Sequence, residues 1–114
     1  MQNMETIKED FVYGTLYEDV KKRGYHGAEC ELTDDTGQLV KGITYQCVLK
    51  WLRRIHKIYV MIDRSFSVKN GWHYAICVDD DFDNILYQDV KPGRSPEEAT
   101  ESAIRRSLLI IDDR

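Results

Sequence analysis

The chain has 114 residues, of which 42% are hydrophobic and 32% are charged, and its formal net charge is −4. This composition fits one globular domain with a hydrophobic core, and it excludes a disordered chain and a coiled coil. The longest apolar stretch, residues 58–62, is too short to span a bilayer, and the first residues do not form a secretory leader, so we expect a cytoplasmic protein without membrane contact.

Residues 1–43 predict a small N-terminal subdomain that packs on the rest of the chain. A capping-box pattern begins at Thr15, and Gly24 follows three basic residues as a helix C-cap does, so we expect a short helix between them. Residues 28–32 and 38–40 flank an Asp/Gly turn, and this pattern predicts a β-hairpin.

The first long helix is predicted to begin after Thr44, which is a favourable N-cap residue. Ile43, directly before the cap, can pack on Val48 one turn inside the helix. Apolar residues then recur at spacings of three and four, and basic residues occupy the other side of helix 44–57. The predicted inward stripe consists of Tyr45, Val48, Leu49, Leu52 and Ile55. The basic face consists of Lys50, Arg53, Arg54 and Lys57.

Three short strands are expected after this helix. In residues 58–63 and 72–78, larger apolar side chains alternate with other residues, as half-buried strands require. Asn70 and Gly71 between them predict a turn with a positive φ angle. A third strand is expected over residues 85–90, and its register stays open. The two alternatives for its inward pair are Ile85 with Tyr87, or Leu86 with Val90.

The last helix has the most specific start signal in the chain. Ser95 is its predicted N-cap, Pro96 takes the first helical position and Glu98 stands three residues after the cap. The predicted fold is therefore α+β, with an α-β-β-β-α core over residues 44–111 and two helices on one face of a three-stranded antiparallel sheet. We expect this core and the N-terminal helix and hairpin to form a single domain of residues 1–114.

The sheet face that the helices leave open is too apolar to lie wholly in water. Alternation places Tyr59 and Met61 on this face in the first strand, and it places His73 and Cys77 there in the second strand. We expect a cover formed by the N-terminal segment 11–20, or else by a second copy of the chain. The candidate interaction surface consists of Lys50, Arg53, Arg54, Lys57, Tyr59, Met61, His73 and Cys77.

Several segments resemble a group of short uncharacterised proteins from phages and mobile elements of gut bacteria. The segments that carry this resemblance are residues 9–12, the short helix that ends in Gly24 and Tyr25, and residues 51–58, 71–74 and 96–99. The resemblance implies a genomic setting and supplies no catalytic residues. Arg54 departs from the pattern, which has an acidic residue at that position.

The order of helices and strands is also similar to that of the double-stranded-RNA-binding domain. That family places a lysine cluster at the start of its second helix, where it holds phosphate groups. In this chain Pro96, Glu97 and Glu98 stand at the matching positions, and two carboxylates repel a phosphate backbone. Nucleic acid is therefore not the expected partner.

Few residues in the chain form a pattern that carries chemistry. His73 and Cys77 share a strand face but lie about 13 Å apart at the rise of a strand, too far to bind one metal or to act as base and nucleophile. The acidic loop of residues 79–84 lacks the glycine and the glutamate of a calcium loop. Cys30, Cys47 and Cys77 have no paired close spacing and predict reduced thiols. We therefore expect no enzyme, and no bound metal or cofactor.

The expected function is that of a small accessory protein of a phage or mobile element, which acts through contacts with an unidentified protein partner or through self-association. The alternative is a nucleic-acid-binding module that uses the basic face of helix 44–57. A continuous basic surface would distinguish the two functions. The residues that could extend the basic face in this way are Arg64, Lys69, Lys91 and Arg94.

Overall fold

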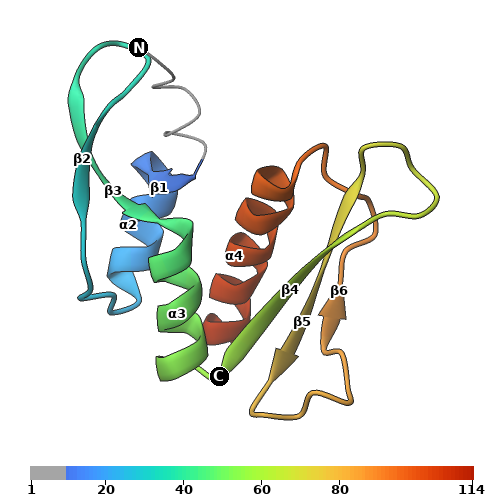
Figure 1. Cartoon of the computed structure of the whole chain (residues 1–114). Coiled ribbons are helices and arrows are strands. Elements are labelled where there is room, and N and C mark those ends of the chain that lie inside the picture. Colours follow the sequence, from blue (N-terminus) through green and yellow to red (C-terminus); the bar gives the residue numbers. More distant parts are fainter. Residues whose placement is uncertain (1–9) are drawn as a thin grey trace.

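The computed structural model describes residues 10–114, which form three helices and two antiparallel three-stranded sheets (Figure 1). In chain order the elements are β1 (Phe11–Tyr13), α2 (Gly14–Lys22), β2 (Cys30–Thr33), β3 (Leu39–Thr44), α3 (Tyr45–Ile55), β4 (Ile58–Arg64), β5 (Trp72–Val78), β6 (Tyr87–Gln88) and α4 (Pro96–Asp112). The predicted α+β class is confirmed, and the expected N-terminal helix and hairpin are present as α2 and the β2–β3 pair.

The first sheet has the strand order β1-β3-β2. Its hairpin turn forms at Asp34, whose carboxylate accepts hydrogen bonds from the backbone N–H groups of Thr36 and Gln38. Pairing of β1 with β3 adds a strand that the sequence pattern does not predict, and it buries Val12 in the core. The N-terminal part of the described chain is therefore anchored by its backbone as well as by its side chains.

The helix starts predicted at Thr44 and Ser95 are confirmed by the hydrogen bonds of their caps. The capping box predicted at Thr15 is wrong, because α2 begins at Gly14 and its N-cap residue, Tyr13, makes no side-chain cap hydrogen bond. The Thr44 hydroxyl accepts the N–H of Cys47 at 3.1 Å. The Ser95 hydroxyl accepts the N–H of Glu98 at 3.1 Å, and the Glu98 carboxylate accepts the N–H of Arg94 at 2.7 Å. These bonds satisfy amides at the start of each helix that would otherwise lack a partner, so α3 and α4 begin where the sequence places them.

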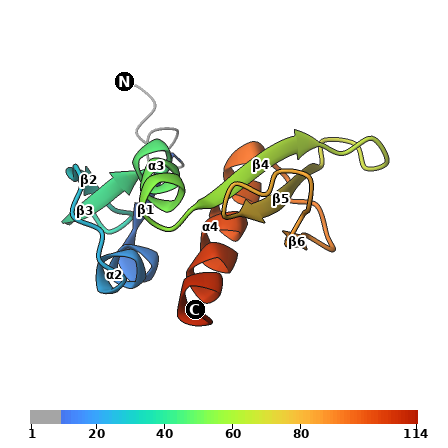
Figure 2. The same ribbon diagram turned by 90° about the horizontal axis from the view of Figure 1, so that it is seen from below.

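The second sheet has the strand order β4-β5-β6, and α4 packs against one of its faces (Figure 2). β4 and β5 pair along the whole length of β4, from Ile58 to Arg64. Asn70 in the turn between them has a φ of 59°, as the predicted turn requires. α3 packs beside α4 and meets this sheet mainly at β4. The second sheet is therefore covered on one side chiefly by α4.

β6 is the shortest strand of this sheet, with two residues. Tyr87 faces α4, because its ring stacks on Tyr74 with centroids 5.9 Å apart and the Arg106 guanidinium lies 4.0 Å from its centroid. Ile85 and Val90 are both exposed. Neither predicted inward pair is therefore complete. β6 pairs with β5 at Tyr87 and Gln88, and the N–H groups of Leu86 and Asp89 each donate one further hydrogen bond to β5.

One hydrophobic cluster joins residues of both sheets and all three helices. On α3, Val48 and Leu52 are fully buried, as the predicted stripe requires. The prediction that Ile55 is buried is wrong: this side chain is 67% exposed, at the last residue of α3. Trp51 is buried instead, with its ring edge-on to Tyr25 at a centroid distance of 5.8 Å.

Candidate functional site

The face of the second sheet that points away from α4 carries the candidate surface residues of β4 and β5. The facing pairs on it are Tyr59 with Cys77, Met61 with Ala75, and Asp63 with His73. Met61 is 42% exposed, Tyr59 and His73 are half-buried, and Cys77 is fully buried. Only part of the predicted surface is therefore open to contact.

The loop after β5 folds back over this face and buries Cys77. Asp79 and Asp80 have positive φ angles of 57° and 63°, which reverse the direction of the chain. The Phe82 ring packs edge-on against Tyr59 with centroids 4.7 Å apart, and the Tyr59 hydroxyl donates a hydrogen bond to Asp80. Because Tyr59 lies directly opposite Cys77, and Cys77 is fully buried, we infer that this loop covers the thiol. Cys77 therefore cannot belong to a contact surface, and this part of the prediction is wrong.

The N-terminal segment 11–20 does not cover the open face, so that expectation is also wrong. Val12, Leu16 and Val20 are buried in the shared core, and β1 is held by its pairing with β3. Backbone pairing thus anchors the segment to the first sheet, on the other side of α3 and α4 from β5 (Figure 1). Among the described residues, the region around Met61 keeps its exposure.

The Tyr59 hydroxyl stays protonated at neutral pH and ties the loop to the sheet. Its pKa is raised above the ordinary value of 10.0, chiefly because it donates a hydrogen bond to the Asp80 carboxylate and secondly because it is partly desolvated. The guanidinium of Arg53 acts in the opposite direction. The Tyr59 hydroxyl therefore remains a hydrogen-bond donor to the loop at neutral pH. Met61 is the exposed residue of this face on β4.

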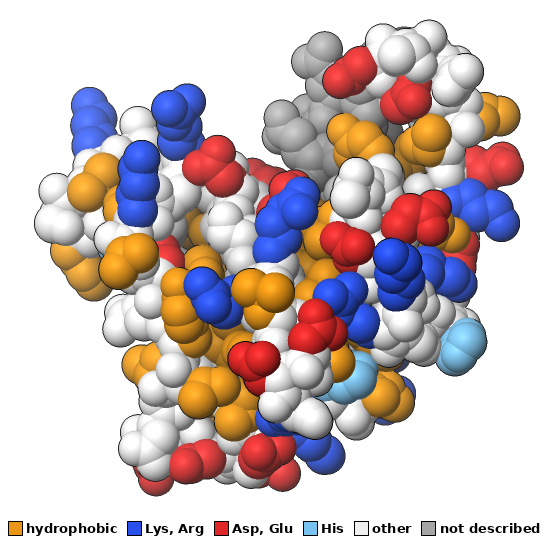
Figure 3. All heavy atoms as spheres, turned by 180° about the vertical axis from the view of Figure 1, so that it is seen from behind, with side chains coloured by type: hydrophobic (Ala, Val, Ile, Leu, Met, Phe, Trp, Pro, Cys, Tyr) orange, Lys and Arg blue, Asp and Glu red, His pale blue; other side chains and the backbone are white. Residues whose placement is uncertain are grey.

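The basic face of α3 is exposed but lies far from the other candidate bases. It ends at Lys57, directly before β4, whereas Arg64 ends that strand about 23 Å away at the usual rise per residue. Lys69 follows in the hairpin turn, and Lys91 and Arg94 lie near the start of α4, at the same distant end. Seen from behind, Lys and Arg side chains stand out at the hairpin end of the molecule (Figure 3). The bases thus form two separate groups.

Acidic groups border the basic face where α3 ends. Arg114 donates a hydrogen bond to the backbone carbonyl of His56 at 2.6 Å and pairs with Asp79 at 3.3 Å. The neighbouring Asp80 is bonded to Tyr59. This mixture of charges suits a protein surface better than a phosphate backbone, which needs an uninterrupted positive field.

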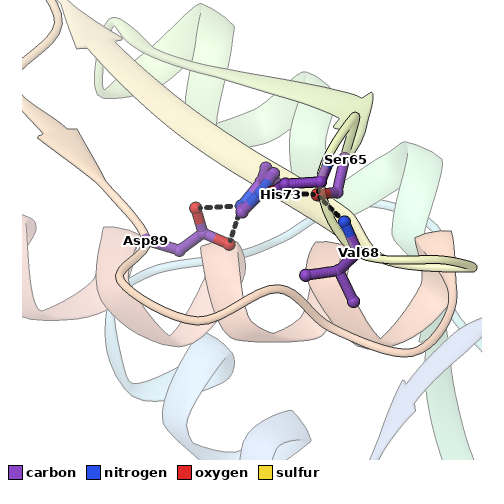
Figure 4. A network of polar contacts seen from close by, with 5 residues as sticks. Ser65, Val68, His73 and Asp89 are labelled. Atoms are coloured by element: carbon purple, nitrogen blue, oxygen red, sulfur yellow. Dashed lines mark hydrogen bonds and ion pairs between the residues drawn. The ribbon is translucent and has the colours of Figure 1, made fainter.

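His73 is tied to the segment after β6 by Asp89. Its Nδ1 lies 3.0 and 3.2 Å from the two carboxylate oxygens (Figure 4), and the Asp89 side chain is only 6% exposed. A carboxylate buried to this degree requires such a partner. Ser65 lies in the same region, where its hydroxyl accepts the N–H of Val68 at 3.1 Å. No hydrogen bond joins Ser65 to His73 in the described chain, so the three residues lack the nucleophile–base contact of a hydrolase triad.

A pocket of about 350 Å³ lies between the end of the second sheet and the start of α4. Its charged lining residues are Asp89, Lys91, Arg94 and Glu98. Glu98 accepts the backbone N–H of Arg94, and Asp89 is held by His73. The two acidic and two basic lining residues balance each other in charge, and the Ser95 cap already accepts a backbone N–H at the start of α4. The lining therefore favours neither an anion nor a cation.

Neither a metal site, a membrane-spanning helix nor a known relative assigns a function to the described part of the chain. The part of the chain that the structure describes has no group of three or more His, Cys, Asp or Glu side chains able to hold a metal ion. No helix within residues 10–114 has the length and apolar character to cross a membrane. No family model, curated protein or solved structure matches this chain.

The outer edge of β4 is a structural feature that the sequence pattern does not identify. β4 is the outermost strand of its sheet, with β5 on one side only. The Lys57 carbonyl accepts the N–H of Asp79, so the odd-numbered residues of this strand bond to β5. The N–H and C=O groups of Ile58, Val60 and Ile62 therefore point to the outer edge, where Ile58 is buried and Val60 and Ile62 are half-buried. No backbone hydrogen bond from residues 10–114 reaches them there.

Opposite charges mark the two ends of this edge. Lys57 directly precedes β4, and Asp63 is its penultimate residue. The Asp63 carboxylate accepts the N–H of Arg64 at 2.8 Å, and neither Lys57 nor Asp63 forms an ion pair with any residue in the described range. Both charges are therefore available to a partner strand.

Proposed function

We propose that this protein acts through contact with another protein chain, and that β4 makes the contact. The observation that carries the proposal is the combination, on one strand, of an unpaired edge and an uncovered apolar side chain, Met61. Proteins usually protect long edge strands with prolines, bulges or covering segments, because a free edge pairs readily with other strands. β4 has no proline and pairs regularly with β5 over its seven residues. Such a strand suits recognition by strand addition.

Exposed apolar side chains around β4 support the same proposal. Phe66 is fully exposed in the turn between β4 and β5, and Val68 in the same turn is also exposed. Phe82 contributes a further exposed ring from the loop that packs on Tyr59. A partner that buried these groups would gain about 25 cal/mol for each Å² of apolar surface removed from water.

The proposal assigns the protein no catalytic step. The resemblance to proteins of phages and mobile elements, together with a surface suited to contacts, supports an accessory role in such an element. Nucleic-acid binding through the basic face of α3 has less support, because Asp79 and Asp80 border that face and the hairpin bases lie at the distant end of β4.

Site-specific photo-crosslinking in cells that carry the natural gene tests this proposal. A photoreactive residue at position 61 should give protein adducts, because this position lies beside the β4 edge. The matched control is position 39, since Leu39 is also exposed but lies on the first sheet. Adducts at neither position, or equal adducts at both positions, would contradict the proposal.

A further inference from the structure

We propose that the hairpin end of the molecule docks on the surface of an anionic lipid bilayer. The hairpin end consists of the turn between β4 and β5, residues 65–71, and of residues 90–94 beside it. This inference goes beyond the proposed function, because it gives this end a partner of a different kind. The expectation of no membrane contact rests on the shortness of the apolar stretches, which bears on crossing a bilayer and not on binding its surface.

Two segments that are distant in the sequence form this end together. Trp72, the first residue of β5, exchanges two backbone hydrogen bonds with Gly93, at 2.9 and 2.8 Å. Gly71 lies against both segments, because a Cβ at this position would stand 3.1 Å from the Cβ of Val68 and 3.2 Å from that of Pro92. The turn and the segment after β6 therefore lie side by side.

Three apolar side chains of the hairpin end are exposed. Phe66 is fully exposed, Val90 is 96% exposed and Val68 is 46% exposed. Hydrogen bonds hold the turn that carries Phe66, since the Ser65 hydroxyl accepts the N–H of Val68 at 3.1 Å and the Gly71 carbonyl accepts the N–H of Ser65 at 2.8 Å. The backbone thus keeps a large apolar ring in water, and an apolar layer that received the ring would be a favourable partner.

Basic side chains accompany these apolar groups. Figure 3 shows Lys and Arg side chains that project at this end next to hydrophobic ones. One base ends β4, one lies in the turn and two lie in the segment after β6, and none of them forms an ion pair with another residue of the range 10–114. The four bases are Arg64, Lys69, Lys91 and Arg94. The hairpin end therefore combines positive charge with apolar surface.

Donors of the chain itself already engage the acidic residues that lie close to these bases in the sequence. Asp63 and Glu98 each accept a backbone N–H at 2.8 and 2.7 Å respectively. The Asp89 side chain is 6% exposed and is held by His73. These carboxylates reduce the positive potential of the hairpin end, but the ammonium and guanidinium groups of the four bases remain available to anions outside the chain.

An anionic bilayer matches both kinds of side chain at once. Its phosphate headgroups lie directly above an apolar layer, so one surface can attract the four bases and bury Phe66. A nucleic acid also offers phosphates, but it would leave Val68 and Val90 in water, because an aliphatic side chain has no aromatic face on which a base can stack. Lipid is therefore the partner that accounts for the charge and for the apolar groups together.

Flotation of the purified full chain with lipid vesicles tests this inference. Vesicles of equimolar phosphatidylcholine and phosphatidylglycerol should bind the protein, and added salt should weaken the binding, whereas vesicles of phosphatidylcholine alone should not bind it. We expect Phe66→Ser to weaken binding about tenfold, because an inserted ring is lost, and Lys69→Gln to weaken it about fivefold, because one attractive charge is lost. The matched controls are Leu39→Ser and Lys50→Gln, which change exposed residues of the first sheet and of α3.

Fluorescence of an introduced tryptophan tests the orientation independently. On the anionic vesicles the emission of Phe66→Trp should shift to shorter wavelength, and lipids with brominated acyl chains should quench it, because position 66 enters the boundary of the acyl layer. Leu39→Trp is the matched control and should show neither change. The unmodified chain corrects for the emission of Trp51 and Trp72.

The outcomes decide between lipid and other partners. Binding to anionic vesicles that falls in Phe66→Ser and persists in Leu39→Ser supports the inference. The inference is overturned if no vesicles bind, if both kinds of vesicle bind equally, or if the two variants lose equal affinity. Binding of an RNA or DNA oligonucleotide that depends on Lys69 but not on Phe66, without vesicle binding, would assign the bases to nucleic acid instead. The vesicle experiments contain no other protein, so the proposed function stands or falls separately on the adducts from position 61.

Discussion

At the scale of single residues, capping side chains determine where this chain changes its structure. The hydroxyl groups of Thr44 and Ser95 each accept a hydrogen bond from a backbone N–H in the first turn of their helix. The Glu98 carboxylate accepts a hydrogen bond from the backbone N–H of Arg94, the residue before the cap. A helix cap typically contributes about 0.5–2 kcal/mol. This is a considerable part of the roughly 5–15 kcal/mol by which a domain is stable. Single hydroxyl groups therefore have measurable effects on the whole protein.

The first prediction concerns the cap of α4. Ser95→Ala should lower the free energy of unfolding by about 0.5–2 kcal/mol, because the N–H of Glu98 loses its acceptor while the helix still has to pack on the sheet. Denaturant unfolding measures the change. Ser102→Ala, at an exposed position inside the same helix, should leave the midpoint nearly unchanged. An equal effect of both substitutions would mean that the Ser95 hydroxyl does not cap α4.

A second prediction concerns His56 at the end of α3. Its pKa is lowered from 6.5 because the imidazole is partly buried and, secondly, because the Arg114 guanidinium lies nearby, and its Nε2 is buried without a hydrogen-bond partner in the described chain. The unfolded chain therefore binds a proton at higher pH than the folded chain. Stability should fall as pH decreases from 6.5 toward the lower pKa of the folded state.

The pH dependence of unfolding measures this effect. His56→Gln should reduce the loss of stability between pH 7 and about 5.5, because it removes the titrating group. Asp112 and Glu29 also have lowered pKa values, owing first to hydrogen bonds from Arg23 and Lys21 respectively. The stability that these two carboxylates contribute is lost only as the pH falls below their ordinary pKa values of 3.8 and 4.5. An unchanged slope above pH 5.5 in His56→Gln would show that His56 is not responsible.

At the scale of elements, the second sheet is protected unequally on its two faces and its two edges. α4 packs against one face of β4 and β5. The loop of residues 79–84 covers the other face at Tyr59 and Cys77, and it leaves Met61 exposed. β6 protects part of one edge, whereas β4 leaves the other edge free of backbone partners in the described chain. The unprotected part of the sheet is therefore confined to one strand.

The third prediction tests the covering loop. Phe82→Ala should speed the labelling of the Cys77 thiol by about tenfold, which corresponds to about 1.4 kcal/mol less protection, because the ring that holds the loop on Tyr59 is lost. Peptide mass spectrometry can follow Cys77 separately from Cys30 and Cys47. Phe66→Ala is the matched control, since Phe66 is fully exposed in the hairpin turn. Equal labelling in both variants would refute this account of how Cys77 is buried.

Local patterns in the sequence predict which helices and strands form better than they predict which of these elements pair or pack together. The caps at Thr44 and Ser95 and the alternation in β4 and β5 depend on residues close in sequence, so they can be recognised there. The pairing of β1 with β3 and the burial of Cys77 depend on distant segments. The free edge of β4 follows from strand order, which alternation does not encode, although the even spacing of Ile58 to Ile62 does identify the strand.

At the scale of the whole molecule, one hydrophobic core joins the two sheets, whereas the candidate basic residues form two separate groups. The hydrophobic cluster includes Val12 and Leu16 from the first part and Ile76 and Ile104 from the second. The bases of α3 and those of the hairpin end lie at opposite ends of β4, and the net charge is −4. We therefore expect the described part of the chain to present a strand edge to a protein partner rather than a continuous basic surface to phosphates.

The fourth prediction follows from this division of charge. The protein should not bind duplex RNA or DNA with submicromolar affinity at physiological salt, because Glu97 and Glu98 stand at the start of α4 and the bases are not joined. Fluorescence anisotropy over a salt series measures binding. Submicromolar binding that weakens steeply as salt rises, and that is lost in Lys50→Asp, would instead favour nucleic-acid recognition by α3.

Amide hydrogen exchange at Val60 tests the role of the β4 edge most directly. In the single chain the Val60 N–H points away from β5, whereas the N–H groups of Tyr59 and Met61 are bonded to β5. Exchange of the isotope-labelled chain, measured by NMR, should therefore be fast at Val60 in the purified protein and should slow markedly in a lysate of cells that carry the natural gene, while Tyr59 and Met61 change little. An exchange rate at Val60 that is the same in buffer and in the lysate would contradict pairing through this edge.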